Sequence, residues 1–114
     1  MIHHIAIGSP SPKDLAKFYE SIPGLRKIQE HRTETGDLRS VWFESGKSIL
    51  MLELGKSQGP KALIFDWNLN EKQEWAVFFA NIPIFERTKF TIYFLDPEGN
   101  KLGVSHYPNP LTEI

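Results

Sequence analysis

Residues 90–107, FTIYFLDPEGNKLGVSHY, contain two strand-like runs separated by a short polar turn. The runs cover 90–95 and 101–107, and both are rich in the β-branched and aromatic residues that strands favour. Between them, Asp96-Pro97-Glu98-Gly99 places Asp, Pro and Gly at the first, second and fourth positions of a type I turn. The stretch therefore predicts a β-hairpin.

Two amphipathic helices are predicted upstream of this hairpin. The first begins at Ser11, which can cap it, with Pro12 at the first helical position and Asp14 completing a capping box. The second begins near Asn70, which can cap together with Gln73. Apolar residues in both helices recur at i, i+3, i+4 and i+7, the spacing of one buried stripe. The stripes are Leu15, Phe18, Tyr19 and Ile22 in the first helix and Trp75, Phe78, Phe79 and Ile82 in the second.

The two stripes are related by a constant offset of 60 residues, which indicates a duplicated unit. A short apolar strand precedes each helix, and three further strand-like runs follow it. The predicted strands cover 2–7, 25–32, 38–44, 47–54, 62–67, 84–87, 90–95 and 101–107. Gly55–Pro60 is the linker-like stretch between the halves. Each half therefore reads β-α-β-β-β, which predicts an α+β fold, and we expect one domain, 1–114, with halves 1–55 and 60–108.

The composition excludes several classes of protein. With 114 residues, 40% of them hydrophobic and 24% charged, the chain fits one globular domain and neither a disordered nor a fibrous protein. Thirteen basic against fourteen acidic residues, without a Lys/Arg-rich run, predict no nucleic-acid partner. No apolar stretch approaches about 20 residues and no signal peptide is evident, so we expect a cytoplasmic protein without a membrane partner. The absence of Cys leaves His, carboxylates, hydroxyls and Lys for any chemistry.

Several segments together resemble the vicinal oxygen chelate superfamily, which includes glyoxalase I, extradiol dioxygenases, methylmalonyl-CoA epimerase and bleomycin-resistance proteins. They are His4-Ile5-Ala6-Ile7, Phe18-Tyr19, Gly24-Leu25 and the run from Tyr93 to Asn100. The resemblance implies paired βαβββ units that form a curved mixed sheet, with the helices on its outer face and a small molecule in its hollow.

The resemblance also implies a divalent metal held by one residue from the first and last strand of each half. His4 matches the first position and Glu53 the second. The third falls on Ile64, or on Ala62 after a two-residue slip, and the fourth on Gly103, and none of these side chains can coordinate a metal. Because metal affinity depends on ligand number and geometry, we expect no cofactor, or at most a weak divalent metal at His4 and Glu53.

A small-molecule site without metal ligands or assigned catalytic residues is predicted on the face that carries these positions. Its predicted residues are His4, Met51, Glu53, Ile64, Asp66, Tyr93, Gly103 and Ser105. We expect His4 and Glu53 to lie close together and to satisfy each other's hydrogen bonds, although His4 could also be an ordinary half-buried strand residue. Glu53 and Asp66 could each bind the ligand or face water, and Asp66 could also supply a displaced third metal ligand. Trp42 is expected in the core and His31 in solvent.

Three functions stay open from the sequence. The leading one is a metal-independent small-molecule binding protein of the glyoxalase, bleomycin-resistance and dioxygenase type. The second is a lyase, isomerase or dioxygenase that uses His4 and Glu53 around a displaced metal, or as a metal-free acid-base pair. The third is a noncatalytic dimeric interaction module. By resemblance we expect a homodimer and a small-molecule ligand, and no motif names that ligand.

Overall fold

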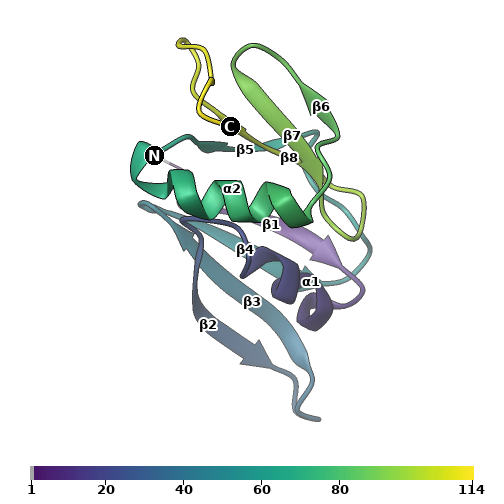
Figure 1. Cartoon of the computed structure of the whole chain (residues 1–114). Coiled ribbons are helices and arrows are strands. Elements are labelled where there is room, and N and C mark those ends of the chain that lie inside the picture. The colour runs from purple at the N-terminus through teal and green to yellow at the C-terminus, as the bar shows by residue number, and fades with distance from the viewer. Residues whose placement is uncertain (1) are drawn as a thin grey trace. The chain divides into compact units, whose positions relative to one another are not determined.

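The computed structural model describes residues 2–114 and divides the chain into two compact units. The first unit ends at Gly59 and the second begins at Pro60. Each contains four strands and one α-helix in the order βαβββ, so the predicted α+β class and strand order are confirmed (Figure 1). That the two units act as one domain stays a prediction. Over residues 2–114, no helix is long and apolar enough to cross a membrane.

The first unit is a four-stranded mixed sheet with one helix on one face. Its elements are β1 (His4–Ser9), α1 (Pro12–Tyr19), β2 (Arg26–Arg32), β3 (Leu38–Ser45) and β4 (Ser48–Leu54). The strand order is β1-β4-β3-β2, and β1 runs parallel to β4 while the other neighbours are antiparallel. Because α1 packs on β3 and β4, the apolar residues of the helix and of one sheet face form a single core. The core residues include Ile7, Leu15, Tyr19, Ile22, Val41, Phe43 and Leu52.

The second unit repeats this topology. Its elements are β5 (Leu63–Asp66), the 3₁₀ turn η1 (Leu69–Glu71), α2 (Lys72–Asn81), β6 (Glu86–Arg87), β7 (Thr91–Leu95) and β8 (Lys101–Ser105). The order β5-β8-β7-β6, with β5 parallel to β8, matches that of the first unit and confirms the predicted duplication. The core is aromatic: the ring of Phe78 on α2 meets Phe94 on β7 edge to face, with centroids 4.8 Å apart.

The predicted start of the first helix is confirmed, with Ser11 at the N-cap position and Pro12 as the first helical residue, but its side-chain cap is not formed, and the capping residue predicted for the second helix is wrong. The Ser11 hydroxyl donates to the Asp14 carboxylate at 3.0 Å and accepts no capping hydrogen bond from a backbone N–H. In the second unit the side chain of Asn68, and not that of Asn70, accepts the N–H of Asn70 at 3.0 Å. Asn68 thereby starts η1, which comes before α2.

The predicted turn between β7 and β8 is confirmed. The N–H of Gly99 donates to the carbonyl of Asp96 at 3.0 Å, and Gly99 has a φ of 85°, where glycine meets no steric penalty. The buried Asp96 carboxylate accepts the N–H groups of Glu98 and Asn100, each at 2.9 Å, and the side-chain amide of Asn100 at 2.8 Å. The Asp96 side chain therefore accepts three hydrogen bonds that add to the backbone hydrogen bond of the turn.

Replacing this carboxylate should destabilise the second unit. Asp96→Ala leaves three donors without their acceptor, so we expect a loss of about 2 kcal/mol in the free energy of unfolding. Chemical denaturation monitored by circular dichroism measures this loss. Asp96→Asn keeps one acceptor oxygen and should lose about half as much. Equal stability of the Ala variant and the parent would contradict this account of the turn.

Candidate functional site

An aromatic cluster occupies the sheet face opposite α1 in the first unit. Trp42 on β3 lies between Met51 on β4 and Gln29 on β2, and its indole contacts two imidazoles. The ring centroid of His31 is 5.3 Å from that of Trp42, and the His4 ring stacks at 6.4 Å with an interplanar angle of 17°. We call His4, His31 and Trp42 the aromatic cluster.

Two members of this cluster differ from their predicted positions. Trp42 is half-buried on the open face instead of lying in the core, and His31 is half-buried against it instead of in solvent. Trp42 Nε1 and His31 Nε2 are shielded from solvent and have no hydrogen-bond partner among the described residues. The signal that could have found them is strand alternation, because Trp42 has the parity opposite to the buried Val41 and Phe43.

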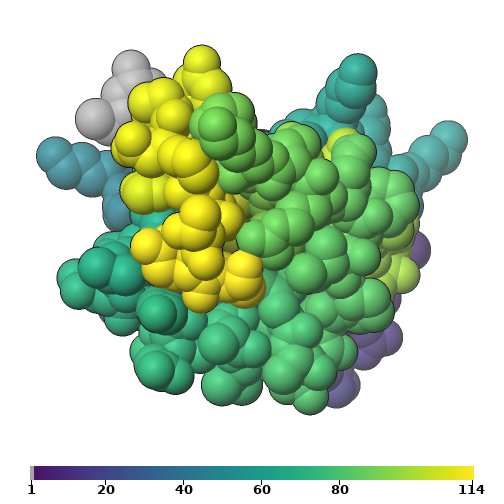
Figure 2. Space-filling view, turned by 45° about the horizontal axis from the view of Figure 1, so that its top comes forward, coloured from purple at the N-terminus to yellow at the C-terminus, as the bar shows by residue number. Residues whose placement is uncertain are grey.

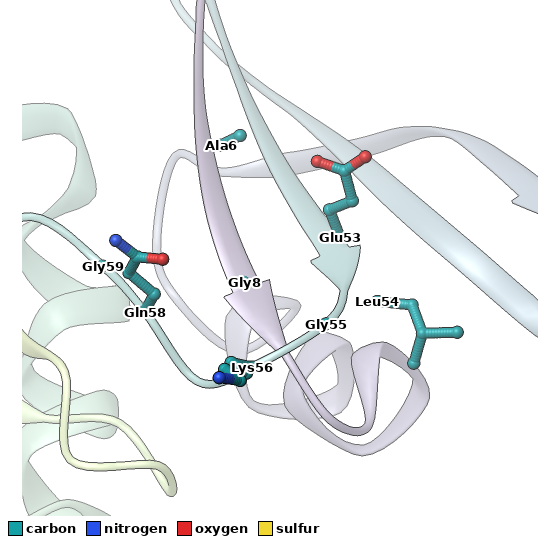
Figure 3. Close-up of a pocket in the computed structure, with 8 residues that line it drawn as sticks. All are labelled: Ala6, Gly8, Glu53, Leu54, Gly55, Lys56, Gln58 and Gly59. Carbon is teal, nitrogen blue, oxygen red and sulfur yellow. The ribbon is translucent and has the colours of Figure 1, made fainter.

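A cavity of about 420 Å³ adjoins this face where β1 and β4 end. It is lined by Ala6, Gly8, Glu53, Leu54, Gly55, Lys56, Gln58 and Gly59. Figure 3 shows β1 passing between Glu53 on β4 and Gln58 on the connecting segment. The Glu53 carboxylate is exposed and forms no hydrogen bond or ion pair with residues 2–114. The predicted linker thus supplies four of the lining residues, which the sequence analysis missed.

The connecting segment is fixed to β1 by backbone hydrogen bonds. The N–H of Gly8 donates to the carbonyl of Gln58 at 2.7 Å, and the N–H of Gln58 donates back at 3.1 Å. The N–H of Gly55 donates to the carbonyl of Ser9 at 2.9 Å. A Cβ atom on Gly8 would overlap the carbonyl oxygen of Lys56, so this close approach requires glycine. The wall of the cavity is therefore an ordered part of the first unit.

His4 and Glu53 do not form the predicted pair. In the parallel register of β1 and β4, His4 lies opposite Ile49 and Glu53 lies opposite Gly8. The two sites are four residues apart along the strands, which at about 3.3 Å per residue is on the order of 13 Å. The Nδ1 atom of His4 lies 2.9 Å from Nδ1 of His3 instead. Alternation places His4 and Glu53 on one face but does not set the register between strands distant in sequence.

In the second unit, the position on β8 at which the resemblance implies a metal ligand is closed by packing. Gly103 is buried and lies between Ile64 on β5 and Tyr93 on β7. A Cβ atom on Gly103 would lie 3.0 Å from Cδ1 of Ile64 and 3.1 Å from Cδ1 of Tyr93. Nζ of Lys101 lies 4.3 Å from the Tyr93 ring centroid, within cation–π distance. The absence of a side chain at Gly103 thus allows Ile64 and Tyr93 to pack over it.

Ser105 and Asp66, the remaining predicted residues, are neighbours in the β5–β8 register. The Ser105 hydroxyl accepts from Thr91 Oγ1 at 2.8 Å and from the Tyr107 N–H at 3.2 Å, and it donates to the carbonyl of Phe90 at 3.3 Å. Its hydrogen-bonding capacity is used within the hairpin. The Asp66 carboxylate is exposed and forms no hydrogen bond or ion pair with residues 2–114.

The side chains at the implied metal positions do not fit a divalent ion. Ile64 and Gly103 provide no donor atom, and Glu53 is four strand residues from the level of His4. Within residues 2–114, no three His, Cys, Asp or Glu side chains come together in a group that could hold a metal. A single imidazole and a distant carboxylate lack the ligand number and geometry that a tight site requires.

No protein-family model and no curated protein match this sequence. Several solved structures nevertheless share the fold over nearly all of both chains. TioX from Micromonospora sp. ML1 is 13% identical with a TM-score of 0.71, and the alignment covers 94% of this chain and 98% of that one. Lactoylglutathione lyase from Agrobacterium tumefaciens is 20% identical with a TM-score of 0.69, covering 94% and 93%. FosX from Listeria monocytogenes, determined as an E126Q mutant with Mn(II) and 1S,2S-dihydroxypropylphosphonic acid, is 16% identical with a TM-score of 0.68, covering 92% and 90%.

These neighbours are vicinal oxygen chelate proteins, so the predicted resemblance is confirmed at the level of the fold. The chain has the paired βαβββ fold of enzymes and resistance proteins of that superfamily. The FosX structure was determined with Mn(II), and its similarity to this chain concerns the fold.

Proposed function

We propose that this chain is a metal-independent small-molecule binding protein and that the open face of the first unit contributes its ligand site. The observation that carries the proposal is the replacement of a metal-ligand set by an aromatic cluster. Only His4 and Glu53 keep coordinating side chains at their implied positions, the two are not level with each other, and the His4 ring stacks near the indole of Trp42. Such a surface favours planar, partly apolar molecules, because aromatic pairs add to the effect of apolar burial.

The polar groups around the aromatic cluster also support a ligand site on this face. Glu53 and Met51 share the open face with Trp42, and the adjoining cavity has room for part of a small molecule. The Glu53 carboxylate has no partner in residues 2–114, so it is available to a cationic or hydrogen-bond-donating group. An acid-base pair of His4 and Glu53 is not supported, because the two residues lie at different levels of the sheet.

Binding of a planar aromatic cation to metal-free protein tests the proposal. We expect acridine orange to bind after EDTA treatment, as measured by fluorescence anisotropy. Trp42→Ala should weaken the affinity at least about fivefold, since a stacked aromatic pair contributes roughly 1 kcal/mol beyond burial. Tyr107→Ala is the matched control, because Tyr107 is an aromatic residue with 74% exposure on the other unit.

Two outcomes would contradict the proposal. One is that acridine orange binds only after Mn, Fe, Ni or Zn is added and about one ion is held tightly per chain. The other is equal affinity of the Trp42→Ala variant and the parent. The homodimer and the cytoplasmic location stay predictions, and light scattering of the purified chain checks the first of them.

A further inference from the structure

A separate cavity lies in the second unit, at the end of β5. Its volume is about 500 Å³, and it is lined by Asp66, Trp67, Asn68, Leu69, His106 and Glu113. Figure 2 shows the C-terminal segment, coloured yellow, against the teal residues that follow β5. All six residues belong to the second unit, so this cavity is independent of the site proposed on the first.

The wall that carries Glu113 is held in place by the sheet. Nη2 of Arg87 donates to the carbonyl oxygen of Leu111 at 3.2 Å and to that of Ile114 at 2.7 Å. The N–H of Leu111 donates to the carbonyl of Lys89 at 2.9 Å, and the Leu111 side chain is buried. Glu113 lies between these two anchored residues, so its backbone is held where the residue lines the cavity.

The polar lining consists mainly of hydrogen-bond acceptors. Asp66 and Glu113 contribute two carboxylates that form no hydrogen bond or ion pair with residues 2–114. His106 Nδ1 is 3.4 Å from the carbonyl oxygen of Pro110, so in the neutral ring it is the N–H donor and Nε2 is left as an acceptor. The Asn68 oxygen is already used by the Asn70 N–H. The lining therefore has two negative charges to offer and no lysine or arginine.

Two other cavities, both in the first unit, include basic side chains as well as carboxylates. The first-unit cavity beside Glu53 includes Lys56, and a second one beneath α1 includes Lys13, Lys17, Lys27 and Arg32. In that second cavity the ammonium of Lys27 already pairs with Glu20 and Glu30, at 3.1 and 3.0 Å. The second-unit cavity thus combines free carboxylates with an indole and a leucine, a lining suited to a cation with a short apolar stem.

We propose that this cavity binds a small organic cation of the primary-ammonium or guanidinium class. Its N–H donors would meet the carboxylates of Asp66 and Glu113, while its methylene groups would contact Trp67 and Leu69. The pairing takes place at an exposed site, so the ionic contribution of each carboxylate is modest.

Agmatine, which carries both cationic groups, is the probe. Titration into ¹⁵N-labelled full chain should shift the amide signals of residues 66–69, 106 and 113 in a saturable way. Asp66→Asn and Glu113→Gln should each weaken binding about fivefold, the upper range for an exposed ion pair, and the double variant should bind no agmatine at the concentrations used. Both substitutions keep the side-chain shape and lie at the surface, so folding should be preserved.

Glu74→Gln is the matched control, because it removes the same charge from an exposed position of the same unit outside the cavity. Its affinity for agmatine should equal that of the parent, and butanoate should cause no shifts. Agmatine affinity unchanged in the double variant, or shifts confined to the first unit, would overturn the proposal. Neither result bears on the aromatic cluster, whose test uses a different probe and a different unit.

Discussion

The Gly103→Glu variant is expected to lose about 2 kcal/mol of unfolding free energy and to gain no metal affinity, because the substitution overpacks the sheet between Ile64 and Tyr93. Gly103 is the position at which the superfamily resemblance implies a metal-binding residue, yet it is buried in this chain. A Cβ atom there would lie 3.0 Å from the carbonyl oxygen of Ile92, which is backbone and cannot rotate away. Ile64 and Tyr93 crowd the same space.

Chemical denaturation and metal analysis of the purified variant check both parts of this expectation. Gly55→Glu is the matched control, because a Cβ atom on Gly55 would meet nothing within 4 Å and its φ is not positive. This control should change stability by less than about 0.5 kcal/mol, as for an ordinary surface substitution. A stable Gly103→Glu protein that binds manganese or nickel would contradict the packing described above, because it would show that the sheet can accommodate a metal-binding side chain at this position.

The architecture was predictable because it depends on short-range patterns of apolar and polar residues in the sequence. The stripes of the two helices and the alternation of the strands recur at one offset, and each pattern buries one face of one element. The turn at Asp96 followed from residue preferences over four positions. The capping residue of the second helix was missed because two asparagines precede it, and it is the Asn68 side chain that accepts the backbone N–H of Asn70.

The candidate site was less predictable because it depends on long-range register. Alternation placed His4, Glu53 and Met51 on one face, but it could not tell that His4 lies level with Ile49. His31 reaches Trp42 only because β2 pairs with β3 in a register that includes two irregularities. The cavity wall from Gly55 to Gly59 has a composition typical of a linker. Its backbone hydrogen bonds to β1 could not be predicted from the sequence, in which only the glycine at position 8 is required by the close approach.

Gly8→Ala is the most direct test of that ordered wall, and we expect it to destabilise the first unit by about 3 kcal/mol. The added methyl group would overlap the carbonyl oxygen of Lys56, so the segment must move away from β1. Movement would break the two hydrogen bonds between Gly8 and Gln58, each contributing about 1 kcal/mol, and would add the cost of the steric overlap. The φ of Gly8 is not positive, so the effect would come from the contact and not from backbone strain.

Hydrogen exchange distinguishes this local effect from a general loss of stability. In Gly8→Ala the amides of Gly55 and Gln58 should exchange much faster than in the parent, whereas the amides of the second unit should be unaffected. Gly55→Ala adds the same methyl group to the same segment in open space, so it should leave both exchange and stability unchanged. If Gly8→Ala and Gly55→Ala behave alike, the connecting segment is not bound to β1, and the cavity beside Glu53 loses its wall.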